Sequence, residues 1–251
     1  ERGGTHFVWL DSDEAFTSNF LGTESGALDF RERLSRMKPG EKLALQWLCL
    51  WKTPYEYRDD ASVWSNQYKD FIVCDDKTIS FEKTLLHEGR TPGPNNTGGV
   101  STWTRISPQD GAVLHFQFVP FAQFQVKQAF QRFREYTMGT GTARRINNKY
   151  AETLDAKSAR TKKIPSNWLT GIAGLDALTR LDTSGTENWY YDAIWKYIDE
   201  KGLLFFEPLQ VWHVPELRKA FIEKFGRKPH PKTYMKIVLW MNKIRRFLLR
   251  K

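Results

Sequence analysis

The side chains most able to do chemistry gather near the end of the sequence, where positive charge dominates. Residues 218–251 contain twelve Lys and Arg but only one acid, Glu223. Five of these cations recur at steps that place them on one side of a helix, opposite an apolar stripe; they are Lys232, Lys236, Lys243, Arg246 and Arg250. Such a row can neutralise successive phosphates of a nucleic acid, and it predicts binding that weakens with salt.

A second basic segment spans residues 144–163, where seven Lys and Arg stand against Glu152 and Asp155. It lacks hydrophobic periodicity and follows a Gly-Thr-Gly-Thr stretch, so we expect a basic linker that becomes ordered only on its partner. The candidate nucleic-acid-binding residues of the two segments are Arg144, Arg145, Lys149, Lys157, Arg160, Lys162, Lys163, Arg227, Lys228, Lys232, Lys236, Lys243, Arg245, Arg246, Arg250 and Lys251.

Aromatic residues are unusually dense between positions 189 and 212. Tyr190, Ile194 and Tyr197 have the spacing of a buried helix face, so most of these rings should fill a core. Exposed rings stack on unpaired bases. We expect at most Trp189 and Trp212 to be available for such stacking.

Other chemistries find little support in the residue pattern. Asp70, Asp75, Asp76 and Glu82 could gather around Mg²⁺, but Asp75 and Asp76 fit a turn, where Asp is favoured for backbone reasons. The five His residues have no metal-ligand spacing with one another or with either Cys. The sequence contains no Walker, GxGxxG or GxSxG pattern. We therefore expect no catalytic residue, no metal and no cofactor.

Helices and a sheet are expected to position these residues. Turn residues delimit predicted helices over 12–20, 26–37 and 41–52. The last is apolar almost all round, which predicts a buried helix, with a buried strand as the alternative. Alternating residues and turns then predict two hairpins, 71–74 with 78–86 and 100–106 with 112–119.

Helical spacing and capping residues predict four further helices, over 122–136, 189–200, 216–225 and 232–249. The predicted fold class is therefore α+β: N-terminal helices, a four-stranded antiparallel sheet backed by a helix, and a C-terminal three-helix module. The corresponding domains are an α+β domain over 1–138, the basic linker over 139–166 and the basic three-helix module over 167–251.

Composition limits the class of protein. With 40% hydrophobic and 14% aromatic residues, the chain can form a substantial core, which argues against disorder. Its apolar stretches fall short of the ~18 to 20 residues that a membrane-spanning helix needs. Two Cys cannot build a disulfide framework, which favours a reducing or redox-neutral compartment. The sequence begins at Glu1 without signal or transit features, so we expect that any targeting segment has been removed.

The charge distribution suggests the function. Residues 1–100 hold 12 Lys and Arg against 16 acids, whereas residues 101–251 hold 26 against 13. These features predict a non-catalytic RNA-binding component of a ribonucleoprotein particle, such as a mitochondrial ribosome or an RNA-processing complex, whose acidic first half contacts proteins. The predicted location is mitochondrial, otherwise cytoplasmic or nuclear.

Two alternatives remain. One is a helix-turn-helix DNA-binding protein with 232–249 as the recognition helix, although Asn242 is the only amide there that could read base edges. The other is a nucleic-acid-processing enzyme whose site is assembled from distant residues.

Overall fold

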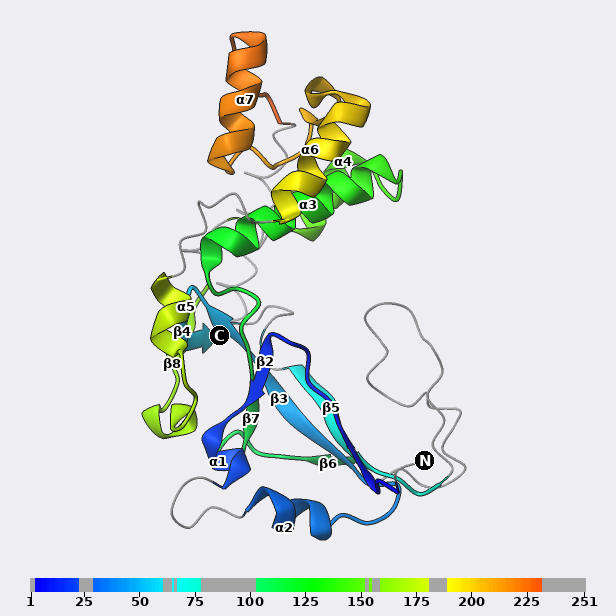
Figure 1. Cartoon of the computed structure of the whole chain (residues 1–251), viewed down its shortest axis with the longest axis vertical. Coiled ribbons are helices and arrows are strands. Elements are labelled where there is room, and N and C mark those ends of the chain that lie inside the picture. Colours follow the sequence, from blue (N-terminus) through cyan, green and yellow to red (C-terminus); the bar gives the residue numbers. More distant parts are fainter. Residues whose placement is uncertain are drawn as a thin grey trace, which may run out of the picture. The chain divides into compact units, whose positions relative to one another are not determined.

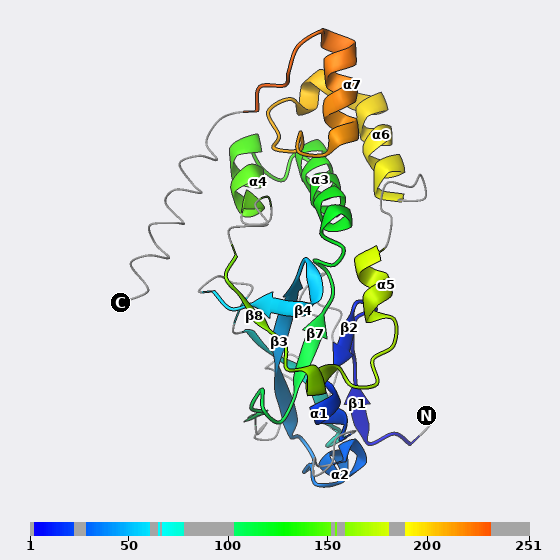
Figure 2. The same cartoon turned by 90° about the vertical axis from the view of Figure 1, so that its left-hand side faces the viewer.

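The chain folds into two compact units, each assembled from two stretches of sequence. The structure is a computed structural model that describes residues 3–22, 29–60, 65, 67–77, 103–151, 154, 159–180 and 189–231. Unit 1 comprises Glu1–Gln117 and Thr161–Leu175, and unit 2 comprises Phe118–Arg160 and Asp176–Lys251. Figure 1 labels most of the helices and strands, and Figure 2 also labels β1 (His6–Val8).

Unit 1 is built around one long strand, β3 (Lys42–Trp51). On one edge β3 pairs antiparallel with β5 (Gln67–Cys74), which pairs antiparallel with β1 (His6–Val8). On the other edge it pairs in parallel with β6 (Trp103–Arg105) and then β7 (Ala112–His115). β2 (Glu14–Phe16) pairs antiparallel with β7. The described strands thus form a mixed sheet.

The end of β3 continues into a small ribbon. Its last residues pair antiparallel with β4 (Thr53–Arg58), and β4 pairs antiparallel with β8 (Thr161–Lys163). Figure 2 shows β8 beside β4, although more than 100 residues of sequence separate them. The short helices α1 (Ser18–Leu21), α2 (Phe30–Ser35) and η2 (Ser166–Leu169) complete unit 1.

The sequence-based prediction of residues 41–52 as a buried helix is wrong, and the alternative of a buried strand is correct. Leu45, Cys49 and Leu50 are fully buried in β3. An apolar run fits a buried helix or a central strand equally well, and here partners on both edges make it a strand. Residues 12–20 likewise contain β2 followed by the single turn of α1 instead of one helix.

The predicted four-stranded antiparallel sheet is also wrong. The expected hairpin of 100–106 with 112–119 does not form, because β6 and β7 follow one another along the same edge of β3. Asp110 and Gly111 both donate backbone hydrogen bonds to Ser107 O (2.8 and 3.0 Å), and the chain then resumes its earlier direction. Ten residues of β3 provide enough edge for both strands. The predicted strand 78–86 lies outside the described residues.

Unit 2 is helical in its described part. Its elements are α3 (Phe121–Thr137), α4 (Ala143–Lys149), α6 (Trp189–Lys201), η3 (Leu203–Phe206) and α7 (Pro215–Phe225). α5 (Leu175–Arg180) crosses the boundary between the units. The helices predicted over 122–136, 189–200 and 216–225 are confirmed, whereas the helix predicted over 232–249 lies outside the described residues.

α3 does not back the sheet, as the predicted fold required, but belongs to the core of unit 2. Its apolar stripe, including Phe130 and Phe133, packs with Ile194 of α6, Phe206 of η3 and Phe221 of α7. These partners come from a distant part of the sequence, so the stripe itself does not reveal which surface it will cover. Within the described residues, no helix combines the length and hydropathy needed to cross a bilayer.

Candidate nucleic-acid interface

Eight of the predicted nucleic-acid-binding residues belong to the described part of the chain, and all eight are exposed. They are Arg144, Arg145 and Lys149 of α4, Arg160, Lys162 and Lys163 at β8, and Arg227 and Lys228 after α7. The structure distributes them over both units. The other eight lie outside the described residues: Lys157, Lys232, Lys236, Lys243, Arg245, Arg246, Arg250 and Lys251.

The segment predicted as a linker contains a helix, α4, that is anchored to the core of unit 2. The Thr142 hydroxyl caps its first turn by accepting from Arg145 N (3.3 Å). Ile146 is buried in the core. The Asn147 side chain donates to Pro208 O (3.0 Å) and accepts from Gln210 N (2.8 Å). Two apolar residues, Ala143 and Ile146, and one buried amide thus fix a helix that lacks the usual apolar periodicity.

A polar cluster secures the end of α4. Arg132 of α3 is fully buried and donates to Gln128 O (3.1 Å) and Tyr150 O (3.0 Å). Burial lowers the pKa of Arg132 to about 9. Glu135 accepts from Lys149 Nζ (2.6 Å) and from the Tyr150 hydroxyl. Burial acts to raise the pKa of Glu135, but these hydrogen bonds outweigh it and hold the pKa below its usual value.

α4 therefore presents a cationic face whose position is fixed. Lys149 is ion-paired with Glu135, and the other two cations of the helix, Arg144 and Arg145, are exposed. Asn148 is exposed beside them. A guanidinium can bind a phosphate through two parallel hydrogen bonds, so this face is suited to an anionic backbone.

The β4–β8 ribbon brings together rings and cations that are far apart in sequence. Tyr57 lies directly opposite Lys162, and Tyr55 shares that face of β4 because side chains alternate along a strand. Tyr55 is 40% exposed. The sequence did not single out either tyrosine as a candidate site residue. The alternation Tyr55-Glu56-Tyr57-Arg58 was a signal for a strand, but nothing local indicated that Lys162 would pair with it.

The turn after α7 is held by an acid. Gly226 ends the helix in the left-handed conformation (φ 63°). Glu207 then accepts from both terminal nitrogens of Arg227 and from His230 N (2.9 Å). Hydrogen bonding to Arg227 lowers the pKa of Glu207 to about 2. Arg227 thus serves to fix this turn, while Lys228 is exposed.

The two tryptophans predicted to stack on bases lie in different environments. Trp212 is 7% exposed, packs edge-on against Phe221 and donates from Nε1 to Glu207 O (3.1 Å). It belongs to the core, so it offers no open ring face. Trp189, at the start of α6, is 57% exposed and lies against Phe130 and Tyr190. Base stacking by Trp189 therefore stays a prediction.

Unit 1 contains a cysteine–histidine–aspartate arrangement that the sequence did not reveal. Cys49 Sγ lies 3.9 Å from His115 Nδ1, and His115 Nε2 lies 3.5 Å from Asp13 Oδ2. A thiol with such partners could act as a nucleophile if its pKa were lowered. Here burial raises the pKa of the fully buried Cys49 to about 12. The thiol is therefore protonated and out of reach of a substrate.

The acidic, His and Cys side chains of the described residues do not form a metal site. These residues contain no group of three or more His, Cys, Asp or Glu side chains suited to a metal ion. Asp75 accepts from the backbone and side chain of Lys77 (2.8 and 3.1 Å), as its predicted place in a turn requires.

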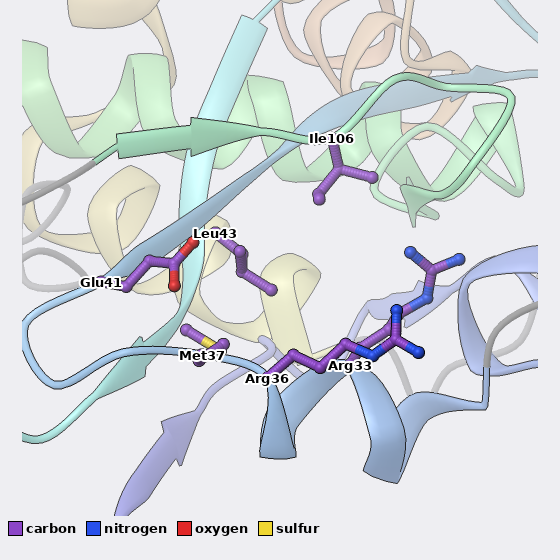
Figure 3. A pocket seen from close by; sticks show the side chains of 6 residues that line it. All are labelled: Arg33, Arg36, Met37, Glu41, Leu43 and Ile106. Carbon is purple, nitrogen blue, oxygen red and sulfur yellow. The ribbon is translucent and has the colours of Figure 1, made fainter.

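A pocket of about 160 Å³ opens in unit 1 beside α2. Arg33 and Arg36 extend along one side of it, and Met37, Leu43 and Ile106 contribute apolar side chains (Figure 3). Arg36 is ion-paired with Glu32. The pocket is smaller than the ~300 to 1,000 Å³ of typical ligand sites.

Comparisons with protein-family models, with curated proteins and with solved structures found no match for this chain.

Proposed function

We propose that the protein is a non-catalytic RNA-binding component of a ribonucleoprotein particle, and that the exposed face of α4 contacts RNA phosphates. The observation that carries this proposal is the fixed position of α4. Asn147 and Ile146 tie the helix to the core, while Arg144 and Arg145 are exposed. Cations held in place lose little conformational entropy on binding, which favours affinity.

The charge of the two units supports the same proposal. Unit 2 contains 23 Lys and Arg against 12 acids, whereas unit 1 contains 15 against 17. The core of unit 2 consists of apolar and aromatic side chains, so most of these cations are not needed for packing. An excess of cations over acids attracts a polyanion over long distances.

The character of the α4 face favours RNA over sequence-specific DNA binding. α4 has seven residues, so it is roughly 10 Å long at 1.5 Å per residue. Its exposed side chains are mainly guanidinium groups, which contact phosphates and carry little base specificity by themselves. Recognition by backbone and shape is typical of structured RNA. The mitochondrial location stays a prediction, which cell fractionation would test.

Salt-dependent binding tests the proposal. The test measures the association constant K for a mixed-sequence RNA stem-loop at several salt concentrations. Replacing both Arg144 and Arg145 by Gln in the full chain should reduce the steepness of log K against log salt concentration. The slope should change by about 1.4 to 1.8, which is about 0.7 to 0.9 for each lost phosphate contact. The matched control replaces Lys196 and Lys201 of α6, which are also exposed, by Gln. This control removes the same charge away from α4 and should change the slope by much less.

Three results would count against the proposal. Equal effects of the two double variants would show that α4 has no special role. Absence of RNA binding at physiological salt would exclude the function. Tight, sequence-selective binding to duplex DNA would favour the helix-turn-helix alternative. The predicted C-terminal row is tested separately by replacing Lys236, Lys243, Arg246 and Arg250 with Gln, which should flatten the slope by about 3 to 4.

A further inference from the structure

One face of the unit 1 sheet carries an ordered group of large polar and aromatic side chains. β5 and β6 lie on opposite edges of β3 at its start (Figure 1). Ala44 of β3 is opposite Asp70 on one side and Arg105 on the other. Directly opposed residues share a face of a sheet, so Asp70 and Arg105 flank the small side chain of Ala44.

Two rings extend this row along the same face. Trp103 is opposite Lys42, and Tyr68 is opposite Gln46. Residues 42, 44 and 46 alternate along β3 and therefore point to the same side. The Arg105 guanidinium lies over both rings, 5.2 Å from the centroid of Tyr68 and 5.2 Å from that of Trp103. The cation thus lies between two aromatic side chains.

The indole of Trp103 is held by a buried acid. Its Nε1 donates to Asp70 Oδ1, across the strand that separates them. Asp70 is only 5% exposed, whereas Trp103 is 47% exposed. A buried carboxylate is costly, and here part of its hydrogen bonding fixes a ring that leaves much of its surface to solvent. An exposed ring with a fixed orientation loses little conformational entropy when a planar ligand stacks on it.

We propose that Trp103, Arg105 and Tyr68 form a stacking site for an unpaired base of single-stranded RNA. Trp103 supplies the ring face, Arg105 supplies a cation for the adjoining phosphate, and Asp70 acts as a positioning residue. The inference rests on the proposed function for the identity of the nucleic acid. The stacking site would be a second RNA contact, located on unit 1. It would bind an unpaired base of a single strand, whereas α4 would bind the phosphates of folded RNA.

The size and charge of the face favour a base over a protein partner. A stable protein interface covers about 800 Å² on each side, whereas the exposed large hydrophobic residue of this group is Trp103 alone. One ring beside one guanidinium matches one base and its phosphate. Base–aromatic stacking with a nearby cation is the usual means of holding single strands.

Binding of fluorescein-labelled twelve-nucleotide RNAs to the full chain tests the site. Trp103→Leu should weaken binding of a single-stranded oligouridine or oligoadenosine roughly 5- to 150-fold, the range for loss of one base–aromatic stack. It should leave unchanged the affinity for an abasic oligomer with the same phosphates. Phe7→Leu is the matched control, because Phe7 is an exposed ring on β1 of the same sheet (38% exposed).

A second variant and a second readout keep the test decisive. Trp103→Phe retains a ring but loses the bond to Asp70, so it should keep part of the affinity. Ultraviolet crosslinking of an iodouridine oligomer to the unmodified protein should label Trp103 or Tyr68. Equal loss of affinity for intact and abasic oligomers, or crosslinks only elsewhere, would overturn the stacking site.

The outcome separates this inference from the proposed function. If the α4 variant alters the salt dependence for the stem-loop but Trp103→Leu alters no binding, the stacking site is wrong and the RNA-binding function stands. If Trp103→Leu acts as expected while the α4 variant has no effect, the α4 contact is wrong and the stacking site stands. If the protein binds neither RNA, both are wrong.

Discussion

His213 provides a sharp test of how unit 2 is packed. It lies in the chain between η3 and α7, and its Nε2 is buried and makes no hydrogen bond to the described residues. Burial, together with the positive charge of Arg132, lowers the pKa of His213 to about 3. In an unfolded chain the pKa of His is ~6.5.

Acidification should therefore destabilise the protein in a defined window. Because the folded pKa of His213 lies below the unfolded one, the unfolded chain binds the proton first as the pH falls. The stability contributed by neutral His213 is fully present above about pH 6.5 and declines between about pH 6.5 and pH 3. From pH 7.5 to 5.0 the loss is about 2 kcal/mol. His213 is partly exposed, so solvent screening makes this value an upper limit.

Urea unfolding of the wild type and His213→Gln at pH 7.5 and 5.0 measures this loss. Gln cannot be protonated, so the variant should lose up to about 2 kcal/mol less stability between the two pH values. Other titrating groups are common to both proteins and cancel in the comparison. Glu207, with its pKa of about 2, remains ionised throughout. In NMR spectra, the His213 ring signals should stay constant down to about pH 4. The same pH dependence in both proteins would refute the reasoning.

Three further predictions follow from single contacts. Asn147→Ala should cost about 2 to 4 kcal/mol, because two partly buried backbone groups lose their hydrogen bonds to this buried side chain. Trypsin should then cleave α4 faster, whereas exposed Asn148→Ala should change neither stability nor cleavage. Gly111→Ala should cost about 1 to 3 kcal/mol by overpacking, since the added Cβ would lie 2.4 Å from a Phe20 ring carbon; a thermal midpoint equal to that of the wild type would contradict this. Glu207→Gln should raise the rate of tryptic cleavage in the turn after α7 several-fold, and an unchanged rate would show that this acid does not hold the turn.

The helices were predictable where the signal was local. α3, α6 and α7 each combine an apolar stripe with end signals, such as Pro215 at the first turn of α7 and Gly226 at its end. α4 escaped prediction because its attachment depends on Asn147, whose partners are residues 208 and 210. A single polar residue creates no periodic pattern in the sequence, so its hydrogen bonds to distant residues cannot be predicted from such a pattern.

The sheet was not predictable, because its pairing is decided by distant residues. The apolar sequence of β3 fits a helix or a strand, and its parallel partners lie 61 to 66 residues away in the sequence. The candidate sites could not be predicted in full for the same reason. Lys162 was identified by its charge, but its neighbour Tyr57 and the Trp103–Asp70 pair depend on strand register, which charge counting does not reveal.

The interrupted course of unit 1 also dictates an order of events during synthesis. β8 completes the ribbon with β4, and Ser18 donates to Trp168 O (3.0 Å), so the unit closes only after residue 168 has been made. By then residues 118–160 of unit 2 have been made, while their partners α6 and α7 have not. Each unit therefore completes its fold only by closing a loop of many residues, and such long-range contacts slow folding. Cutting the gene at any one boundary between the units would leave at least one unit divided between the two halves.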